Sequence, residues 1–187
     1  MTTISAMALA QGSHKVDEST GTLRVKTYRE GVAARVGHDL VIDVAKWNAT
    51  VEVGADGAIT SIALDADPRS LAVLEGLRGV KPLTDRDRAD IARTIDEKIL
   101  GGGEIALRTS SCEAPSGART SARGELTLAG ATRPIAFEVA TGDDGRVSAT
   151  VRVVQTQWGI KPYRGLMGAL KVRDDIEVVV DARLPVA

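Results

Sequence analysis

Hydrophobic and polar residues alternate with a period of two along most of the chain, as they do in a β-strand with one buried face. Leu23 and Val25, for example, alternate with Arg24 and Lys26. Valine, isoleucine and threonine fill 47 of the 187 positions, and their β-branched side chains favour pleated sheets. The alternation predicts nine strands, at residues 23–25, 36–44, 49–53, 62–66, 105–109, 122–128, 135–139, 147–153 and 176–184.

Turn sequences between these segments predict hairpins. Asp56-Gly57 and Asp144-Gly145 are turn dipeptides flanked by alternating runs, and Ala129-Gly130 is a third short connection. Short connections join antiparallel neighbours, and a sheet of this size hides its edges by curling or closing. We therefore predict a single antiparallel β-barrel over residues 16–187. Residues 1–15 are predicted to form an N-terminal lead whose polar character is compatible with disorder.

One segment has the pattern of a helix. Thr84-Asp85-Arg86-Asp87 has the form of a capping box, with Asp where Glu or Gln is usual. Gly101 suits the C-terminal cap. Between the caps, isoleucine recurs at i, i+4 and i+8, which places Ile91, Ile95 and Ile99 on one face. The sequence predicts an α-helix at about residues 84–100, whose apolar stripe covers one mouth of the barrel.

Composition and charge exclude several classes of protein. The 24 basic and 25 acidic residues give a net charge of −1, so no overall positive field favours nucleic acid. No window approaches the ~20 apolar residues that a membrane span needs. Cys112 is the single cysteine, and the N-terminal segment lacks the basic region of a signal peptide. We expect a soluble, reduced, cytoplasmic protein with no membrane span.

Catalytic signatures are scarce. The chain has two histidines and one cysteine, and no nucleophile-elbow, zincin or Walker pattern occurs. Asp39, Asp43, Asp65 and Asp67 lie on predicted strands without a second group to form an acid–base pair, so we expect them on solvated faces. Cys112 has no evident base and is interpreted as a packed small hydrophobe. We therefore predict no catalytic residues, no cofactor and no metal site.

His38 is the more informative histidine, because it has the parity of the apolar face of its predicted strand. An unbroken strand would point it inward together with Val36, Leu40 and Ile42. Three interpretations follow. His38 is a hydrogen-bonded core residue, a polar group that orients a ligand in a mostly apolar cavity, or a metal ligand. The third lacks an evident second His or Cys partner.

Residues 155–173 form a long connection between two predicted strands. This connection contains four basic residues and, before Asp174, no acidic one, and its glycines and proline interrupt regular structure. Trp158 and Tyr163 are two of the five aromatic residues, and Lys161 and Arg164 lie close to them in sequence. Two interpretations remain: a structural loop packed on the barrel, and a lid that meets an anionic or polar head group.

The order of these elements and several short motifs resemble the YceI-like family. The most specific motifs are residues 124–135 (GELTLAGATRPI) and residues 157–160 (QWGI), where Trp replaces the usual Phe. The resemblance spans about residues 16–184. It implies a lipocalin-like, extended, eight-stranded antiparallel barrel with one helix and no catalytic residues. Family members are similar to binders of polyisoprenoid chains, such as polyprenyl quinones, and are commonly exported.

We therefore interpret the chain as a non-enzymatic protein that binds or carries an amphiphilic, isoprenoid-like molecule inside the barrel. The alternatives are a small barrel enzyme of isomerase or cyclase type that uses His38, and a stress-related interaction protein with a packed interior. The sequence leaves a homodimer open. The expected ligand-binding residues are His38, Phe137, Trp158, Lys161, Tyr163 and Arg164.

Overall fold

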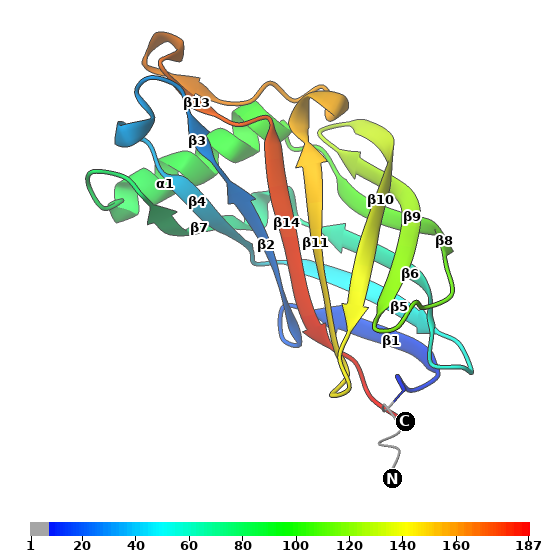
Figure 1. Cartoon of the computed structure of the whole chain (residues 1–187). Helices are drawn as coiled ribbons and strands as arrows, with labels where there is room; N and C mark the ends of the chain where they lie inside the picture. The colour runs from blue at the N-terminus through cyan, green and yellow to red at the C-terminus, as the bar shows by residue number, and fades with distance from the viewer. Residues whose placement is uncertain (1–7) are drawn as a thin grey trace.

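The computed structural model describes residues 8–187, and in this part of the chain an eleven-stranded antiparallel sheet curls into a half-barrel with one α-helix beside it (Figure 1). The mainly β, lipocalin-like fold with a single helix is therefore confirmed. In the order in which they are hydrogen-bonded, the strands are β1 (Gly12–Asp17), β5 (Trp47–Val53), β6 (Ile59–Ala66), β8 (Ile105–Cys112), β9 (Arg119–Leu128), β10 (Ala131–Thr141), β11 (Arg146–Val154), β14 (Asp175–Arg183), β2 (Gly21–Thr27), β4 (Asp39–Val44) and β7 (Leu71–Leu77).

The described sheet has more strands than the expected eight. All nine predicted strands are present, and β1 and β7 are the two that the alternation missed. Both lie at the edges of the sheet, and each has one buried residue, Val16 in β1 and Val73 in β7. An edge strand with one buried residue shows little alternation, so its sequence resembles a loop. Because β1 begins at Gly12, part of the expected lead belongs to the sheet, whereas residues 1–7 lie outside the described residues.

The second predicted strand begins later than expected. Ala34–Val36 form a 3₁₀ turn, and β4 begins only at Asp39. Val36 is therefore not a strand residue, and 52% of its surface is exposed. His38 directly precedes β4 and still lies on the same side as Leu40 and Ile42, on the concave face of the sheet.

The predicted helix is present and begins at its predicted cap. The Thr84 hydroxyl accepts the Asp87 backbone N–H, and the Asp87 carboxylate accepts the Thr84 backbone N–H, so both halves of the capping box form. α1 (Asp85–Thr94) then continues as one wider π-helical stretch, η3 (Ile95–Leu100). Gly101 ends it with a φ of 59°, in the left-handed region that favours glycine.

A second, three-stranded sheet lies at the upper end of the barrel in Figure 1. It consists of β12 (Arg164–Gly165), β13 (Leu170–Val172) and β3 (Arg29–Glu30), in that order. β13 pairs with β3 through Lys171–Glu30 and Val172–Arg29, more than a hundred residues away in sequence. The expected loop at 155–173 is therefore partly ordered into strands.

The buried hydrophobic residues form two clusters. The larger includes Trp47 and extends to Leu9 and Leu184, at the end of the barrel near the C-terminus (Figure 1). The smaller consists of Leu100, Leu128, Val153, Trp158 and Ile160. No helix among residues 8–187 is long and apolar enough to cross a membrane.

Cys112 lies half-buried in β8 and packs against the larger cluster. Burial raises the pKa of its thiol, so less of the reactive thiolate is present at neutral pH. We expect Ellman's reagent to label the native protein at least ~10-fold more slowly than the urea-unfolded protein. Labelling at equal rates would show that the thiol is accessible in the fold.

Candidate functional site: an apolar cavity with one charged end

The concave face of the sheet and the helix enclose a cavity of about 760 Å³. All eleven strands of the described sheet contribute wall residues, because alternation points every second side chain inward. The helical segment contributes its predicted stripe of Ile91, Ile95 and Ile99. Protein interiors usually pack with few voids larger than a water molecule. A space this large in an otherwise packed domain contradicts the interpretation of a fully packed interior.

The wall is almost entirely aliphatic. Trp47, Phe137 and Tyr163 are its only aromatic residues within the described chain. This follows from the sequence, in which aromatic residues make up 3%. Short branched side chains line the sheet without reaching across the barrel, so the interior stays open. Such a wall offers dispersion contacts to an apolar guest and few hydrogen bonds.

Charged side chains reach the cavity at one end only. Arg29 comes from β3, Lys171 from β13, and Lys81, Asp87 and Asp90 come from the segment that leads into and begins the helix. These segments lie at the upper left of the molecule in Figure 1. The cavity is therefore amphipathic along its length, apolar over most of its wall and charged where it meets this end.

His38 lines the cavity at the charged end. Its Nε2–H donates to the Lys81 backbone oxygen at 2.7 Å, which holds the ring against the segment before the helix. Gly79 makes room for the ring, since a Cβ there would lie 2.0 Å from His38 Nε2. Asp87 accepts from the Thr84 backbone and hydroxyl, and these bonds lower the pKa of its carboxyl. Within residues 8–187, no group of three His, Cys, Asp or Glu side chains could hold a metal ion.

Asp39 holds the strands together at the charged end of the cavity, a structural role that the sequence analysis missed. It is 7% exposed, so the expectation of a solvated face is wrong for this carboxylate. It accepts the Arg29 backbone N–H at 2.9 Å and pairs with Arg78 at 3.4 Å. These bonds fasten β3 and the end of β7 to β4, next to His38. A buried carboxylate needs such partners, and only the paired strands supply them.

The other predicted ligand-binding residues divide into two groups. Phe137 and Tyr163 line the cavity, Phe137 on β10 and Tyr163 before β12. Lys161 and Arg164 are exposed and lie outside the cavity wall. Trp158 is also outside the wall and is 3% exposed, packed in the smaller core cluster. The structure therefore corrects the placement of Trp158: it is a core residue and not part of the cavity mouth.

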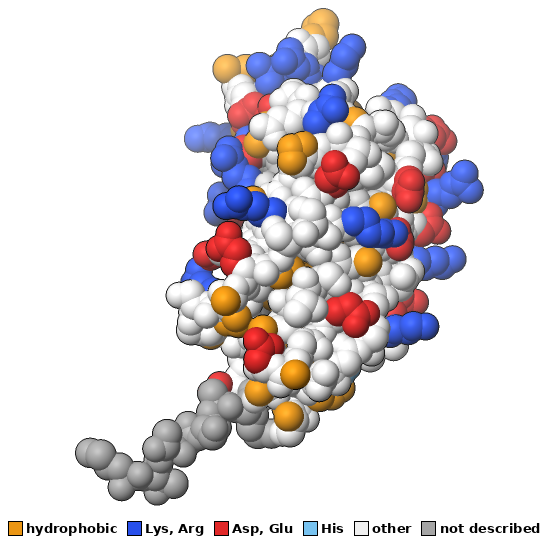
Figure 2. All heavy atoms as spheres, turned by 90° about the vertical axis from the view of Figure 1, so that its right-hand side faces the viewer, with side chains coloured by type: hydrophobic (Ala, Val, Ile, Leu, Met, Phe, Trp, Pro, Cys, Tyr) orange, Lys and Arg blue, Asp and Glu red, His pale blue; other side chains and the backbone are white. Residues whose placement is uncertain are grey.

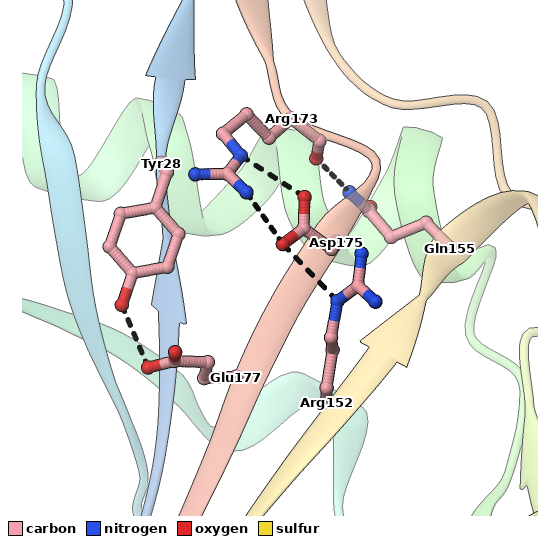
Figure 3. A network of polar contacts seen from close by, with 6 residues as sticks. All are labelled: Tyr28, Arg152, Gln155, Arg173, Asp175 and Glu177. Atoms are coloured by element: carbon pink, nitrogen blue, oxygen red, sulfur yellow. Dashed lines mark hydrogen bonds and ion pairs between the residues drawn. The ribbon is translucent and has the colours of Figure 1, made fainter.

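A polar network braces the outer face of the sheet beside the charged end (Figure 3). Arg173 donates to both Asp175 oxygens at 3.0 and 2.8 Å, and Arg152 pairs with the same carboxylate at 3.4 Å. The Gln155 side-chain amide donates to the Arg173 backbone oxygen at 3.0 Å. The two ends of the 155–173 connection are therefore tied to each other and to β14 and β11.

Tyr28 extends this network to β2. Its hydroxyl donates to Glu177 at 2.7 Å, and the Arg173 guanidinium lies 5.5 Å from its ring centre (Figure 3). The hydrogen bond to Glu177, with burial, raises the pKa of Tyr28 above its usual value of 10.0. Because the pKa of Tyr28 is higher in the folded protein than in the unfolded chain, its protonated hydroxyl stabilises the fold. This stabilisation is fully present below the unfolded-state pKa of Tyr28 and is lost as the pH rises through its folded-state pKa.

We therefore expect Tyr28→Phe to lower the free energy of unfolding by about 0.5–1 kcal/mol at pH 8, a small effect because the pair is only part-buried and water screens it. The difference from the wild-type chain should shrink as the pH rises above about 10. Urea unfolding at a series of pH values measures it. A difference that grows with pH would contradict the assigned bond.

A curled antiparallel sheet around an apolar cavity, with a helix against its open side, defines the lipocalin-like class of β proteins. Within that class the chain belongs to the YceI-like family, because the model of the YceI-like domain matches residues 3–184. A search of curated proteins finds no match.

Solved structures share this fold at low sequence identity. Burkholderia cenocepacia BcnA is 12% identical, with a TM-score of 0.65 over 89% of this chain and 97% of that chain. The YceI protein of Campylobacter jejuni is also 12% identical, with a TM-score of 0.54 over 75% of this chain and 81% of that one. A polyisoprenoid binding domain from Saccharophagus degradans is 7% identical, with a TM-score of 0.51 over 94% and 100%. At these identities the likeness concerns the fold alone.

Proposed function

We propose that the cavity binds a long amphiphilic molecule of isoprenoid type, such as a polyprenyl quinone, with its tail on the aliphatic wall and its head at the charged end. The observation that carries the proposal is the cavity itself, about 760 Å³ of aliphatic-walled space with charged groups at one end only. Burial of apolar surface contributes roughly 25 cal/mol per Å², so a long tail gains affinity without specific hydrogen bonds. The role is binding and carriage rather than catalysis.

Two comparisons support this ligand class. The chain is a member of the YceI-like family, and the Saccharophagus degradans domain with the same fold is described as polyisoprenoid binding. The few polar groups at the charged end, including His38 and Lys81, suit the oxygen atoms of a head group. The enzyme alternative has less support, since His38 is engaged with a backbone carbonyl rather than with a carboxylate.

Native mass spectrometry of the purified protein, combined with organic extraction, tests the proposal. We expect a co-purified lipid, or saturable uptake of an added polyprenyl quinone at one molecule per chain. Trp47 lines the cavity, so the quinone should quench its fluorescence, and the quenching should largely disappear in Trp47→Phe. A protein that purifies empty and takes up no isoprenoid would overturn the proposal.

His38→Ala tests the position of the head group. We expect it to weaken quinone binding by about 10-fold, the effect of removing one hydrogen-bonding group of about 1.4 kcal/mol. His14→Ala is the matched control, because His14 also donates from Nε2 to a backbone oxygen, that of Ala10 at 2.6 Å, but lies outside the cavity wall. Equal affinities for the two variants would place the head group elsewhere.

A further inference from the structure

Three segments meet at the charged end of the cavity and form one surface, which we name the tip surface: residues 29–38, 77–81 and 161–171. β3 pairs with β13, and the Ala33 backbone N–H donates to the Ala169 oxygen at 2.9 Å. The Val80 backbone N–H donates to the Arg35 oxygen at 3.3 Å, which joins the second segment to the first. These bonds hold the three segments together as one end of the molecule.

The tip surface is strongly basic, although the whole chain has a net charge of −1. Its one acidic residue is Glu30. None of the ion pairs described for residues 8–187 involves Arg35, Lys161, Arg164 or Lys171, so these cations remain available to an external partner. Figure 2 shows blue side chains gathered at the upper end of the molecule. The basic residues are Arg29, Arg35, Arg78, Lys81, Lys161, Arg164 and Lys171.

The same surface carries nearly all the exposed large hydrophobic side chains. Of the eight such residues within the described chain, seven belong to the tip surface and the eighth, Leu74, lies on the adjoining strand β7. Elsewhere the outer face of the barrel carries arginine–carboxylate pairs, such as Arg108–Asp65, Arg119–Glu138 and Arg146–Asp181. Apolar side chains concentrated in this way mark an interaction site. The seven are Val32 (95% exposed), Val36 (52%), Leu77 (45%), Val80 (69%), Tyr163 (45%), Leu166 (60%) and Met167 (107%).

The tip of this surface is a hairpin loop with a strained backbone. β12 and β13 pair at Gly165 and Leu170, and the loop between them begins with Leu166 and Met167. Both have positive φ, 48° and 54°, in the left-handed region where Asn and Gly are the usual residues. Two large apolar side chains at these positions cost folding stability and gain little burial. Strain of this kind is typical of functional sites.

The cavity reaches the tip surface. Arg29, His38, Lys81, Tyr163 and Lys171 belong both to the surface and to the cavity wall. An apolar guest that enters or leaves at the charged end therefore passes between the exposed aliphatic and basic side chains. Long isoprenoid chains reside in bilayers, so the natural source of such a guest is a membrane.

We infer that the tip surface binds the surface of an anionic phospholipid bilayer. Leu166, Met167 and Val32 enter the interfacial region, and the basic side chains around them contact lipid phosphates. This attachment places the charged end of the cavity against the bilayer and opens a dry path between the two. The inference goes beyond ligand binding, because it assigns a separate surface and a separate partner. The combination of aliphatic tips with a ring of cations favours a bilayer over an acidic protein, whose surface has no apolar layer to accept them.

Vesicle sedimentation tests the inference. The probes are vesicles of phosphatidylcholine with 30% phosphatidylglycerol, and vesicles of pure phosphatidylcholine, both without isoprenoid. We expect binding to the anionic vesicles at low salt, much weaker binding to the neutral ones, and loss of binding as salt screens the charges. Equal binding to both vesicle types, or none to either, would overturn the inference.

Two sets of variants identify the surface. The double substitution Leu166→Asn and Met167→Gly gives the hairpin its favoured turn residues, so stability should be unchanged or higher while vesicle binding falls at least ~10-fold. The triple substitution Arg35→Gln, Lys161→Gln and Arg164→Gln should lower vesicle binding by about two orders of magnitude.

A charge-matched triple control lies elsewhere on the exposed surface: Lys15→Gln, Lys46→Gln and Arg69→Gln. It should retain most of the binding. If both triple variants lost vesicle binding equally, the loss would be explained by the net charge of the protein alone, and the assignment to the tip surface would be overturned. Sedimentation of the protein without vesicles adds a second check. If the protein self-associates and the double variant does not, the tip surface is a contact between copies of the chain, and the inference of bilayer binding is overturned.

Discussion

Replacing Trp158 by alanine should destabilise the protein by about 3–5 kcal/mol while leaving its affinity for an isoprenoid ligand nearly unchanged. The indole is 3% exposed and packs in the smaller core cluster, and its Nε1–H donates to the Leu126 backbone oxygen at 2.8 Å. Truncation removes this packing and leaves a part-buried carbonyl without its indole partner. For a domain of this size, the melting temperature should fall by roughly 10 °C.

Urea unfolding followed by circular dichroism measures the stability, and mass spectrometry measures lipid retention at a temperature where both proteins are folded. Tyr163→Ala is the contrasting variant, because Tyr163 lines the cavity but is 45% exposed. It should change stability by less than about 1 kcal/mol. If Trp158→Ala instead keeps its stability and loses the ligand, then the indole contacts the ligand and the core assignment is wrong.

The alternation of side chains was sufficient to predict the sheet, because most strands bury one face against the same interior. β2 shows why: Leu23 and Val25 face Val180 and Val178 of β14 across the ladder, and Arg24 and Lys26 alternate with them on the outside. The helix was also predicted correctly, since its N-terminal cap and its stripe of isoleucines are local sequence patterns. The wider π-helical stretch after Thr94 was not predicted, because isoleucine spacing does not distinguish the two helix types.

The site was predicted less completely, and the two tryptophans show the reason. Trp47 has the inward parity of Ala49 and Val51, so its place in the cavity wall follows from a pattern that is present in the sequence. Trp158 lies in an irregular segment, where parity gives no direction. Its burial depends on the 3₁₀ turn Gln155–Trp158 folding against β9 and β10, which are distant parts of the sheet.

The tip surface could not be predicted from local patterns at all. Its segments come from three regions of the chain, and β3 is only two residues long. The basic character of residues 155–173 was evident from the sequence. Only the tertiary fold, however, brings these residues next to Arg35 and Val80. Asp39 was misassigned for the same reason: strand parity placed it outside, and only the neighbouring β3 and Arg78 bury it.

Substituting Ala149 by tryptophan should abolish isoprenoid binding, with a loss of affinity of at least ~100-fold and little loss of stability. Ala149 lies near the middle of β11 and lines the cavity. An indole at this position projects into the existing space of about 760 Å³ and takes the place of the ligand tail. Because the space is already open, the substitution avoids most of the 1–3 kcal/mol that overpacking costs in a filled core. Aromatic residues are also well suited to strands.

Thr150→Trp is the matched control for this variant. Thr150 is the next residue of the same strand, and its exposed side chain points to the outer face. Both variants add an indole to β11, on opposite faces of the sheet, so a difference between them depends on the cavity alone.

Quinone uptake measured by native mass spectrometry should be normal in Thr150→Trp and absent in Ala149→Trp. Vesicle binding through the tip surface should be retained in both, because that surface lies at the end of the barrel. Normal uptake by the Ala149→Trp protein would place the ligand outside the cavity.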